Sequence, residues 1–242
     1  GIRDLPDNYL RACAFGVLVR PEGVNPLIKP RTDTSFPCPM RGKTVAWECA
    51  DTFNPAAVEK DGKICILYRA EDDPKAGIGG RTSRIGYAES ADGIHLDYRQ
   101  ATPVFYPDGS DISRTYEWKG GCEDPRVVAA NVKGKTLYVM TYTAWNNRTP
   151  RLAIATSTDL QHWTKHGPAL LNAYNGKFKD LACKSGSIVT EGVNGKQVAA
   201  KVKVNGKKKY LMYWGAQWVC AATSDAVVNW PPDVDETQNL VY

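Results

Sequence analysis

The stretch LAIATSTDLQHW, residues 152–163, has two counterparts elsewhere in the same chain. IGYAESADGI occupies residues 85–94, and VCAATSDAVVNW occupies residues 219–230. The serine that all three stretches share recurs at an interval of 67 residues in both steps. A fixed long period of this kind is the sequence signature of a repeat architecture.

A second repeated element precedes each of these stretches. The tripeptides DGK, KGK and NGK stand at residues 61–63, 133–135 and 205–207, with their glycines 72 residues apart in both steps. Strand-forming β-branched and aromatic residues flank each tripeptide, as expected for hairpins with tight glycine turns. The pattern of each unit therefore predicts four antiparallel strands, the number found in one blade of a β-propeller. A β-sandwich would show short strands without the fixed period.

The number of units sets an expectation about the domain. About three complete units fit into the chain, and residues 231–242 resemble the start of a fourth. Propellers close their ring with four to eight blades. We therefore expect an all-β fold, with residues 1–242 forming a single β-propeller domain that is incomplete at its C-terminus.

Composition excludes several other classes of protein. The hydrophobic fraction of 43% is ordinary for a globular domain, and no apolar run is long enough to span a bilayer. The net charge of +5 is mild, and the basic stretch Lys201–Lys209 has no interleaved stacking aromatics. We expect neither nucleic acid nor a membrane as a partner, while a homo-oligomer stays compatible with the sequence.

The cysteines and histidines do not form a metal-binding pattern. The seven cysteines are an odd number, are widely spaced and include no Cys-x-x-Cys pair. The three histidines lie in turn-like polar segments. We therefore expect no metal and no cofactor, and a reducing, cytoplasmic location. The chain does not begin with Met, so a processed N-terminus and a periplasmic location stay open as the alternative.

Polar and aromatic residues gather at the start of the predicted first strand of each unit. These clusters occupy residues 47–57, 116–126 and 179–186. Aromatic rings beside carboxylates and amides suit a sugar, whose hydroxyls need directional hydrogen bonds and whose ring has apolar faces. Gly120-Gly121 would let the backbone approach a ligand. A turn at Asp124-Pro125 and a Glu123–Arg126 ion pair are the structural alternatives.

Several of these motifs resemble one known family. They include WECADTFNPAA at residues 47–57, LYRAED at residues 67–72 and GGCEDPR at residues 120–126. Together with TSRIG at residues 82–86, MTYTA at residues 140–144 and ATSTDL at residues 155–160, they resemble glycoside hydrolase family 130 over about residues 45–230. The resemblance implies a five-bladed β-propeller, and a family of inverting β-mannoside phosphorylases and β-1,2-mannosidases.

The resemblance also implies roles for individual residues. Asp124 corresponds to the general acid, which is thought to deliver its proton through the 3-hydroxyl of the mannose ring. Asn54 and Arg69 fall in the sugar pocket, and a permanently charged guanidinium there suits a phosphate or a hydroxyl-rich ligand. We expect Asp124 as the catalytic residue, with substrate-binding residues at Asp51, Asn54, Arg69, Tyr116, Glu123, Arg126, Lys184 and Trp214.

The strand end at Trp214-Gly215-Ala216 indicates whether the chain is closer to the phosphorylases or to the hydrolases of the family. The resemblance leads us to expect a His-Arg pair there in phosphorylases, and its lack favours water as the nucleophile. We therefore predict an inverting β-mannosidase acting on β-1,2-linked manno-oligosaccharides. A phosphorylase with inorganic phosphate as cosubstrate is the first alternative. A catalytically silent glycan-binding propeller is the second, because Ala216 stands where hydrolytic members would carry one of two glutamates.

Overall fold

The computed structural model describes residues 20–77, 79–231 and 240–241, and this part of the chain is almost entirely β-structure. Its helical elements are the six-residue helix α2 (Asp111–Tyr116) and a 3-10 turn at Ala173–Gly176. No helix in the described part of the chain has the length and apolar character needed to cross a membrane. The expected all-β fold is confirmed.

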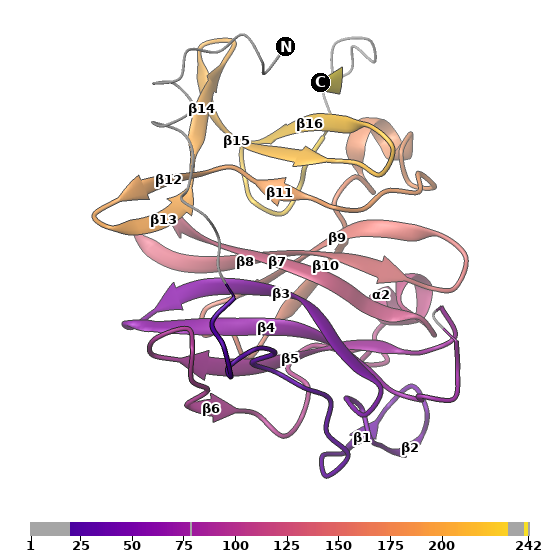
Figure 1. Cartoon of the computed structure of the whole chain (residues 1–242). Helices are drawn as coiled ribbons and strands as arrows, with labels where there is room; N and C mark the ends of the chain where they lie inside the picture. The colour runs from indigo at the N-terminus through magenta and orange to yellow at the C-terminus, as the bar shows by residue number, and fades with distance from the viewer. Residues whose placement is uncertain (1–19, 78, 232–239, 242) are drawn as a thin grey trace, which may run out of the picture.

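The strands form three consecutive antiparallel units, which follow one another in chain order from bottom to top of Figure 1. The first unit pairs β3 to β6 and the second pairs β7 to β10, each in sequential order. Their bounds are β3 (Asp51–Lys60), β4 (Lys63–Glu71), β5 (Ser83–Ser90), β6 (Tyr98–Arg99), β7 (Gly121–Val132), β8 (Lys135–Trp145), β9 (Pro150–Ser157) and β10 (Thr164–Pro168). A separate hairpin, β1 (Phe36–Cys38) with β2 (Lys43–Val45), precedes the first unit.

The third unit has an interrupted first strand. Two short segments pair with the same strand β15, and the hairpin of β12 and β13 is inserted between them. This insertion was not expected from the sequence. The elements of the third unit are β11 (Ser187–Ile188), β12 (Thr190–Val193), β13 (Lys196–Ala199), β14 (Lys201–Val204), β15 (Lys207–Trp214), β16 (Val219–Ser224) and β17 (Leu240–Val241).

The predicted glycine turns are present in all three units. Gly62, Gly134 and Gly206 have φ angles of 78°, 77° and 80°, and the residue before each of them also has a positive φ. Two consecutive positive φ angles define the hairpin turn whose twist matches the flanking strands. The repeated tripeptides therefore fix the register of the first two strands of each unit.

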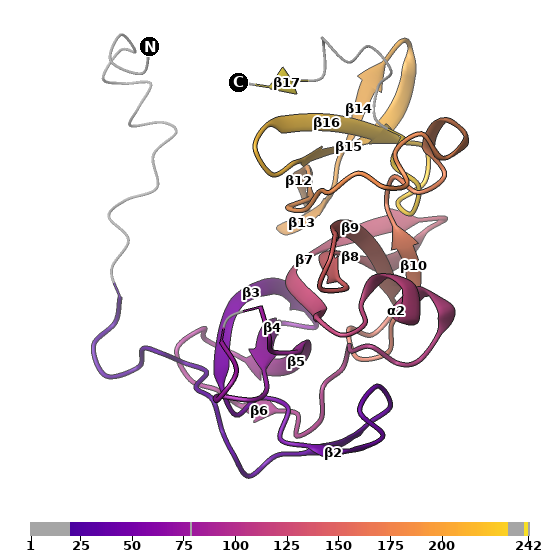
Figure 2. The ribbon, with the colours of Figure 1, turned by 90° about the vertical axis from the view of Figure 1, so that its right-hand side faces the viewer.

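Neighbouring units touch through limited backbone pairing and through two apolar clusters, one shared by the first and second units and one shared by the second and third. One parallel bridge joins Ser83 of β5 to Gly121 of β7. Another joins Val198 of the inserted hairpin to Ala129, and Lys196 of that hairpin lies 3.3 Å from Glu59. Figure 2 shows α2 beside the second unit, where it contacts β10. Within the described residues the sheets do not close into a ring, so a five-bladed propeller stays a prediction.

The structure gives Gly120 and Gly121 a different role from the one that the sequence suggested. A Cβ atom on Gly121 would lie 2.1 Å from the carbonyl oxygen of Ser83, and one on Gly120 would lie 1.9 Å from the Trp145 ring. Gly121 therefore allows the second unit to pack against the first, and Gly120 makes room for the Trp145 ring within the second unit. The expectation that they make room for a ligand was wrong, because protein atoms already fill that space.

Candidate active site

Two β-bulges place the central polar residues. The pairing of β3 with β4 shifts between Phe53 and Ala56, and that of β7 with β8 shifts between Glu123 and Arg126. Within these bulges Asn54 has a φ of 44° and Asp124 a φ of 47°. Such angles are uncommon for residues other than glycine, and they concentrate at functional sites. Bulges also re-aim side chains at the rims of sheets.

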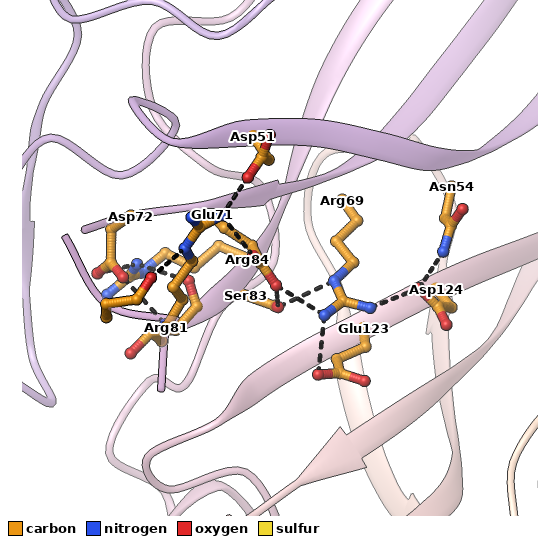
Figure 3. A network of polar contacts seen from close by, with 12 residues as sticks. Asp51, Asn54, Arg69, Glu71, Asp72, Arg81, Ser83, Arg84, Glu123 and Asp124 are labelled. Atoms are coloured by element: carbon orange, nitrogen blue, oxygen red, sulfur yellow. Dashed lines mark hydrogen bonds and ion pairs between the residues drawn. The ribbon is translucent and has the colours of Figure 1, made fainter. Parts of the chain in front are cut away.

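The two bulged residues meet across the junction of the first and second units. The Nδ2 atom of Asn54 donates a hydrogen bond to Oδ1 of Asp124 over 2.9 Å, and Nη1 of Arg69 donates to the same oxygen over 2.8 Å. Figure 3 shows these two side chains converging on Asp124. The Asp124 side chain keeps 32% of its surface exposed. One carboxylate oxygen is thus fixed by donors, while the side chain still has access to a ligand.

Arg69 is the hub of the network. Its Nη2 atom donates to Glu71 over 2.7 Å and to Glu123 over 3.0 Å, and its Nε atom donates to Ser83 over 3.0 Å. The guanidinium also lies 4.5 Å from the centre of the Phe53 ring. Because the Arg69 side chain is only 11% exposed and each guanidinium nitrogen has a partner, its position is strongly determined.

A second layer of charges surrounds this hub. The buried carboxylate of Glu71 also accepts a hydrogen bond from Ser83 over 3.0 Å, and its other oxygen lies 3.5 Å from Arg81. Arg81 in turn forms an ion pair with Asp51. Asp51 therefore joins the network of Figure 3 through Arg81 rather than by touching Asp124.

The two adjacent carboxyl groups have opposite pKa shifts. Burial raises the pKa of Glu123, and the nearby negative charges of Asp124 and Glu71 oppose the lowering effect of Arg69. Burial alone would also raise the pKa of Asp124. There the hydrogen bonds from Asn54 and Arg69 and the charge of Arg69 outweigh burial, so its pKa lies below the usual value. Environments that separate two carboxyl groups in this way are typical of acid–base chemistry.

The remaining predicted residues lie around this centre without bonding to it. Tyr116 ends α2, and its ring lies 5.3 Å from the guanidinium of Arg151. Lys184 is exposed, and its charge contributes to lowering the pKa of Asp124. Arg126 and Trp214 line another cavity, between β7 of the second unit and the end of β15 in the third. The Glu123–Arg126 ion pair, one of the structural alternatives, is not formed among the described residues, because Glu123 pairs with Arg69.

The third polar cluster does not begin a strand as expected. Residues 181–186 have no regular structure, and β11 starts only at Ser187. Ser185 nevertheless has a φ of 62°, and the peptide nitrogen of Gly215 donates to the carbonyl oxygen of Lys184 over 3.0 Å. In the third unit this cluster therefore lies in a loop that a backbone hydrogen bond from Gly215 holds in place.

Three members of the network were missing from the predicted site. Glu71, Ser83 and Arg81 all support Arg69 directly or through one neighbour. The signal was present, because Glu71 follows Arg69 by two residues and side chains so spaced share one face of a strand. Across the described residues, no group of His, Cys, Asp and Glu side chains has an arrangement that could hold a metal ion.

Comparison with known proteins places this site in context. A family model described as beta-1,4-mannooligosaccharide phosphorylase matches residues 25–239. A 1,2-beta-oligomannan phosphorylase of Thermoanaerobacter sp. (strain X514) is 34% identical over 188 residues, which cover 76% of this chain and 53% of that protein.

Two solved structures are more similar in sequence. One, 58% identical with a TM-score of 0.86, comes from work describing glycoside hydrolases of the GH130 family that target beta-1,2 mannosidic linkages in Candida mannan. The other is a glycosyl hydrolase from Bacteroides ovatus, 54% identical with a TM-score of 0.86. Each alignment covers 98% of this chain and 62% of the other. The chain thus spans between about half and two thirds of the length of these relatives.

Proposed function

The chain belongs to glycoside hydrolase family 130, and on that premise we propose that it hydrolyses β-1,2-mannosidic bonds with inversion at the anomeric carbon. Members of the family are glycoside phosphorylases or hydrolases that act on β-mannosides. The similarity to structures of glycoside hydrolases at 54–58% identity supports the hydrolytic reaction.

Asp124 is the proposed proton donor, and its surroundings constrain how it works. The carboxylate accepts bonds from Asn54 and Arg69, which favour its ionised form. Proton donation requires the opposite form, so substrate binding must weaken or replace one of these bonds. A sugar hydroxyl that competes for Asn54 or Arg69 would do this, and it would couple acid strength to substrate binding.

The observation that carries the choice of water over phosphate is the end of β15. Trp214, Gly215 and Ala216 bring no cationic side chain to the place where the resemblance leads us to expect a phosphate-binding His-Arg pair. Without those charges a phosphate dianion would be held less firmly, and water is the remaining nucleophile.

Phosphorolysis is the second candidate, and a specific observation favours it. Arg126 is exposed on β7, the strand that carries Asp124, and Lys184 is exposed in the loop before β11. Arg126 has no ion-pair partner among the described residues. Two free cations could hold a phosphate in place of the expected pair. The 34% identical relative is a phosphorylase.

The test is product analysis on β-1,2-mannobiose with and without about 10 mM phosphate, a level above typical KM values. We expect mannose at the same rate in both samples. Mannose 1-phosphate formed only with phosphate would contradict hydrolysis and establish the second candidate.

Ala216 provides a further test, because inverting hydrolysis needs a second carboxylate roughly 6.5–9.5 Å from the acid to activate water. Ala216→Glu should raise hydrolysis by about 100-fold if this position supplies the base. The matched variant Ala216→Gln should not. Sugar binding without turnover in both variants would indicate a silent glycan-binding protein.

A further inference from the structure

A cavity of about 350 Å³ lies between the first and second units, far along the sheets from Asp124. Its walls come from the segment that follows β6 and from the turn that leads into β10. In the pairing order of their units β6 and β10 are the last strands, whereas Asp124 lies on β7, the first strand of the second unit. Strands β8 and β9 therefore separate β10 from the strand that carries Asp124.

Trp163 forms part of the wall, and the repeat shows what is unusual about it. Trp230 stands 67 residues later at the same place in the third unit and is fully buried. Each indole nitrogen donates to the carbonyl oxygen three residues earlier, over 2.9 Å for Trp163 and 2.8 Å for Trp230. The same turn thus fixes both rings, but Trp163 stays partly exposed and lines the cavity. A fixed ring in a cavity can stack on the apolar face of a pyranose.

Two side chains in the same lining have hydrogen-bonding capacity to spare. Gln161 bonds to Asp159 through its backbone nitrogen, and its side-chain amide has no partner among the described residues. Asp108 is exposed, and its Oδ1 atom accepts a hydrogen bond from the backbone nitrogen of Ser110 over 3.0 Å. Burial raises the pKa of Asp108, but the bonds from Ser110 and the charge of Lys165 lower it further, so the carboxylate is ionised. An ionised carboxylate and an amide together can accept from and donate to sugar hydroxyls.

The nearby cation Lys165 does not make this cavity an anion site. Its Nζ atom pairs with the buried carboxylate of Glu117 and donates to the carbonyl oxygen of Tyr106 over 2.7 Å. The Lys165 side chain is only 7% exposed, so its charge is matched inside the protein. The ionised Asp108 would repel an anion. An uncharged ligand rich in hydroxyls therefore fits the lining better than phosphate does.

We propose that this cavity is a second carbohydrate-binding site, which takes one neutral pyranose ring, with Trp163 as the stacking surface and Asp108 and Gln161 as hydroxyl partners. The cavity volume falls in the range of small-molecule sites, roughly 300–1,000 Å³. Because two strands lie between β10 and the strand of Asp124, a sugar held here is bound without being cleaved. The inference goes beyond the proposed hydrolysis and does not depend on it.

The test follows the indole NMR signals of the ¹⁵N-labelled protein during titration with β-1,2-mannotriose, in an Asp124→Asn background that prevents turnover. The Trp163 signal, assigned by its loss in Trp163→Phe, should shift and approach saturation at about 10 mM, as for a millimolar Kd. Asp108→Ala and Gln161→Ala should each raise the Kd read from this signal about fivefold to tenfold, because each removes a hydrogen bond. Asp73→Ala is the matched control. Asp73 also accepts from the backbone nitrogen two residues later but lies outside the cavity lining, so its loss should leave this Kd unchanged.

Three outcomes would overturn the inference. The Trp163 signal could stay fixed up to about 10 mM mannotriose, which would exclude a site with a millimolar Kd. It could shift with a Kd that neither Asp108→Ala nor Gln161→Ala changes, which would mean that it reports binding elsewhere. Inorganic phosphate could shift it at lower concentration than mannotriose, which would identify an anion site. A shift that meets the expectations in a protein without turnover of β-1,2-mannobiose would contradict the proposed function alone.

Discussion

The first two units each bury a complete ionic triad, and the described residues of the third unit do not. In the first unit Glu48, fully buried, accepts hydrogen bonds from Tyr68 over 2.8 Å and from Arg99 over 2.5 Å. In the second unit Glu117, also fully buried, accepts a bond from Tyr142 over 2.8 Å and pairs with Lys165. The same three roles recur on corresponding elements.

Among its described residues, the third unit has a tryptophan in place of the tyrosine and no carboxylate in the role of Glu48 and Glu117. Trp214 follows Gly206 by eight residues, as Tyr142 follows Gly134. Its Nε1 atom is buried and has no hydrogen-bond partner among the described residues. A buried donor without a partner costs roughly 1–3 kcal/mol. The triads of the first two units are therefore fully paired, although Nε of Arg84 in the first unit is also buried without a partner, whereas the third unit presents exposed side chains on a tight connection.

The largest expected effect concerns catalysis at the junction of the first two units. Asp124→Asn keeps the bulge but removes the ionisable group, so turnover should fall by about 100-fold to 10,000-fold with the fold retained. The rate is measured on β-1,2-mannobiose, and circular dichroism checks the fold. Asp180→Asn changes an exposed carboxylate of the third unit and serves as the control. Turnover close to the parent rate in Asp124→Asn would remove Asp124 from the mechanism.

Breaking a triad should strongly affect stability. Glu117→Gln leaves the buried Lys165 without its counter-charge, and the free energy of unfolding should fall by about 3–5 kcal/mol. Urea denaturation measures the change. Glu48→Gln should behave in the same way, since Arg99 loses the same kind of partner. If both variants lose less than about 1 kcal/mol, the triads do not distinguish the first two units from the third.

Glu71→Gln tests the support of the site itself. The substitution keeps the shape but removes the charge that holds Arg69, so Arg69 can shift relative to Asp124. We expect kcat/KM to fall by about tenfold to 100-fold, because small misplacements of positioning groups are costly. Glu71→Asp, which restores the charge, should recover part of the loss. A fall in unfolding temperature with unchanged kcat/KM would limit Glu71 to a structural role.

Most of the fold could be predicted from local sequence patterns, whereas the contacts between units could not. The turns at Gly62, Gly134 and Gly206 follow from adjacent residues alone. The inserted hairpin β12–β13 also has such a turn, at Asn194-Gly195. Because this hairpin interrupts the first strand of the third unit, the sequence pattern did not distinguish its turn from those of the repeat. Gly121 was misread because its steric role depends on Ser83, which belongs to another unit.

The site residues, likewise, could be predicted only where local sequence motifs surround them. Asn54, Arg69 and Asp124 stand out because family motifs surround them, and the structure brings all three into contact. Ser83 reaches Arg69 and Glu71 through the pairing of β4 with β5, so its role becomes visible only when the register is known. Glu71 could have been found from its two-residue spacing to Arg69, which places both side chains on one face of the strand.

The smallest expected effect lies in the polar turns that end the repeated stretches. In the second unit, Oδ1 of Asp159 accepts bonds from the backbone nitrogens of Gln161 and His162, and the His162 ring contacts its other oxygen. The third unit has Ala226 at this place. Asp159→Ala should therefore lower the free energy of unfolding by about 1 kcal/mol at pH 7.

The pH dependence of that loss gives the sharper test. Partial burial alone would raise the pKa of Asp159, but the bonds from His162, Gln161 and Ser157 hold it well below the usual value. Its folded pKa thus lies below its unfolded pKa, so the stabilisation is complete above about pH 4 and disappears as the pH falls through the folded pKa. The free energies of unfolding of the parent and of Asp159→Ala should therefore converge in urea titrations at acid pH.

The third-unit control Asp225→Ala should stay within about 0.5 kcal/mol of the parent at every pH, because Asp225 is exposed and pairs only loosely with Lys209. A gap between parent and Asp159→Ala that persists unchanged in acid would mean that packing, and not the ionised carboxylate, stabilises the turn.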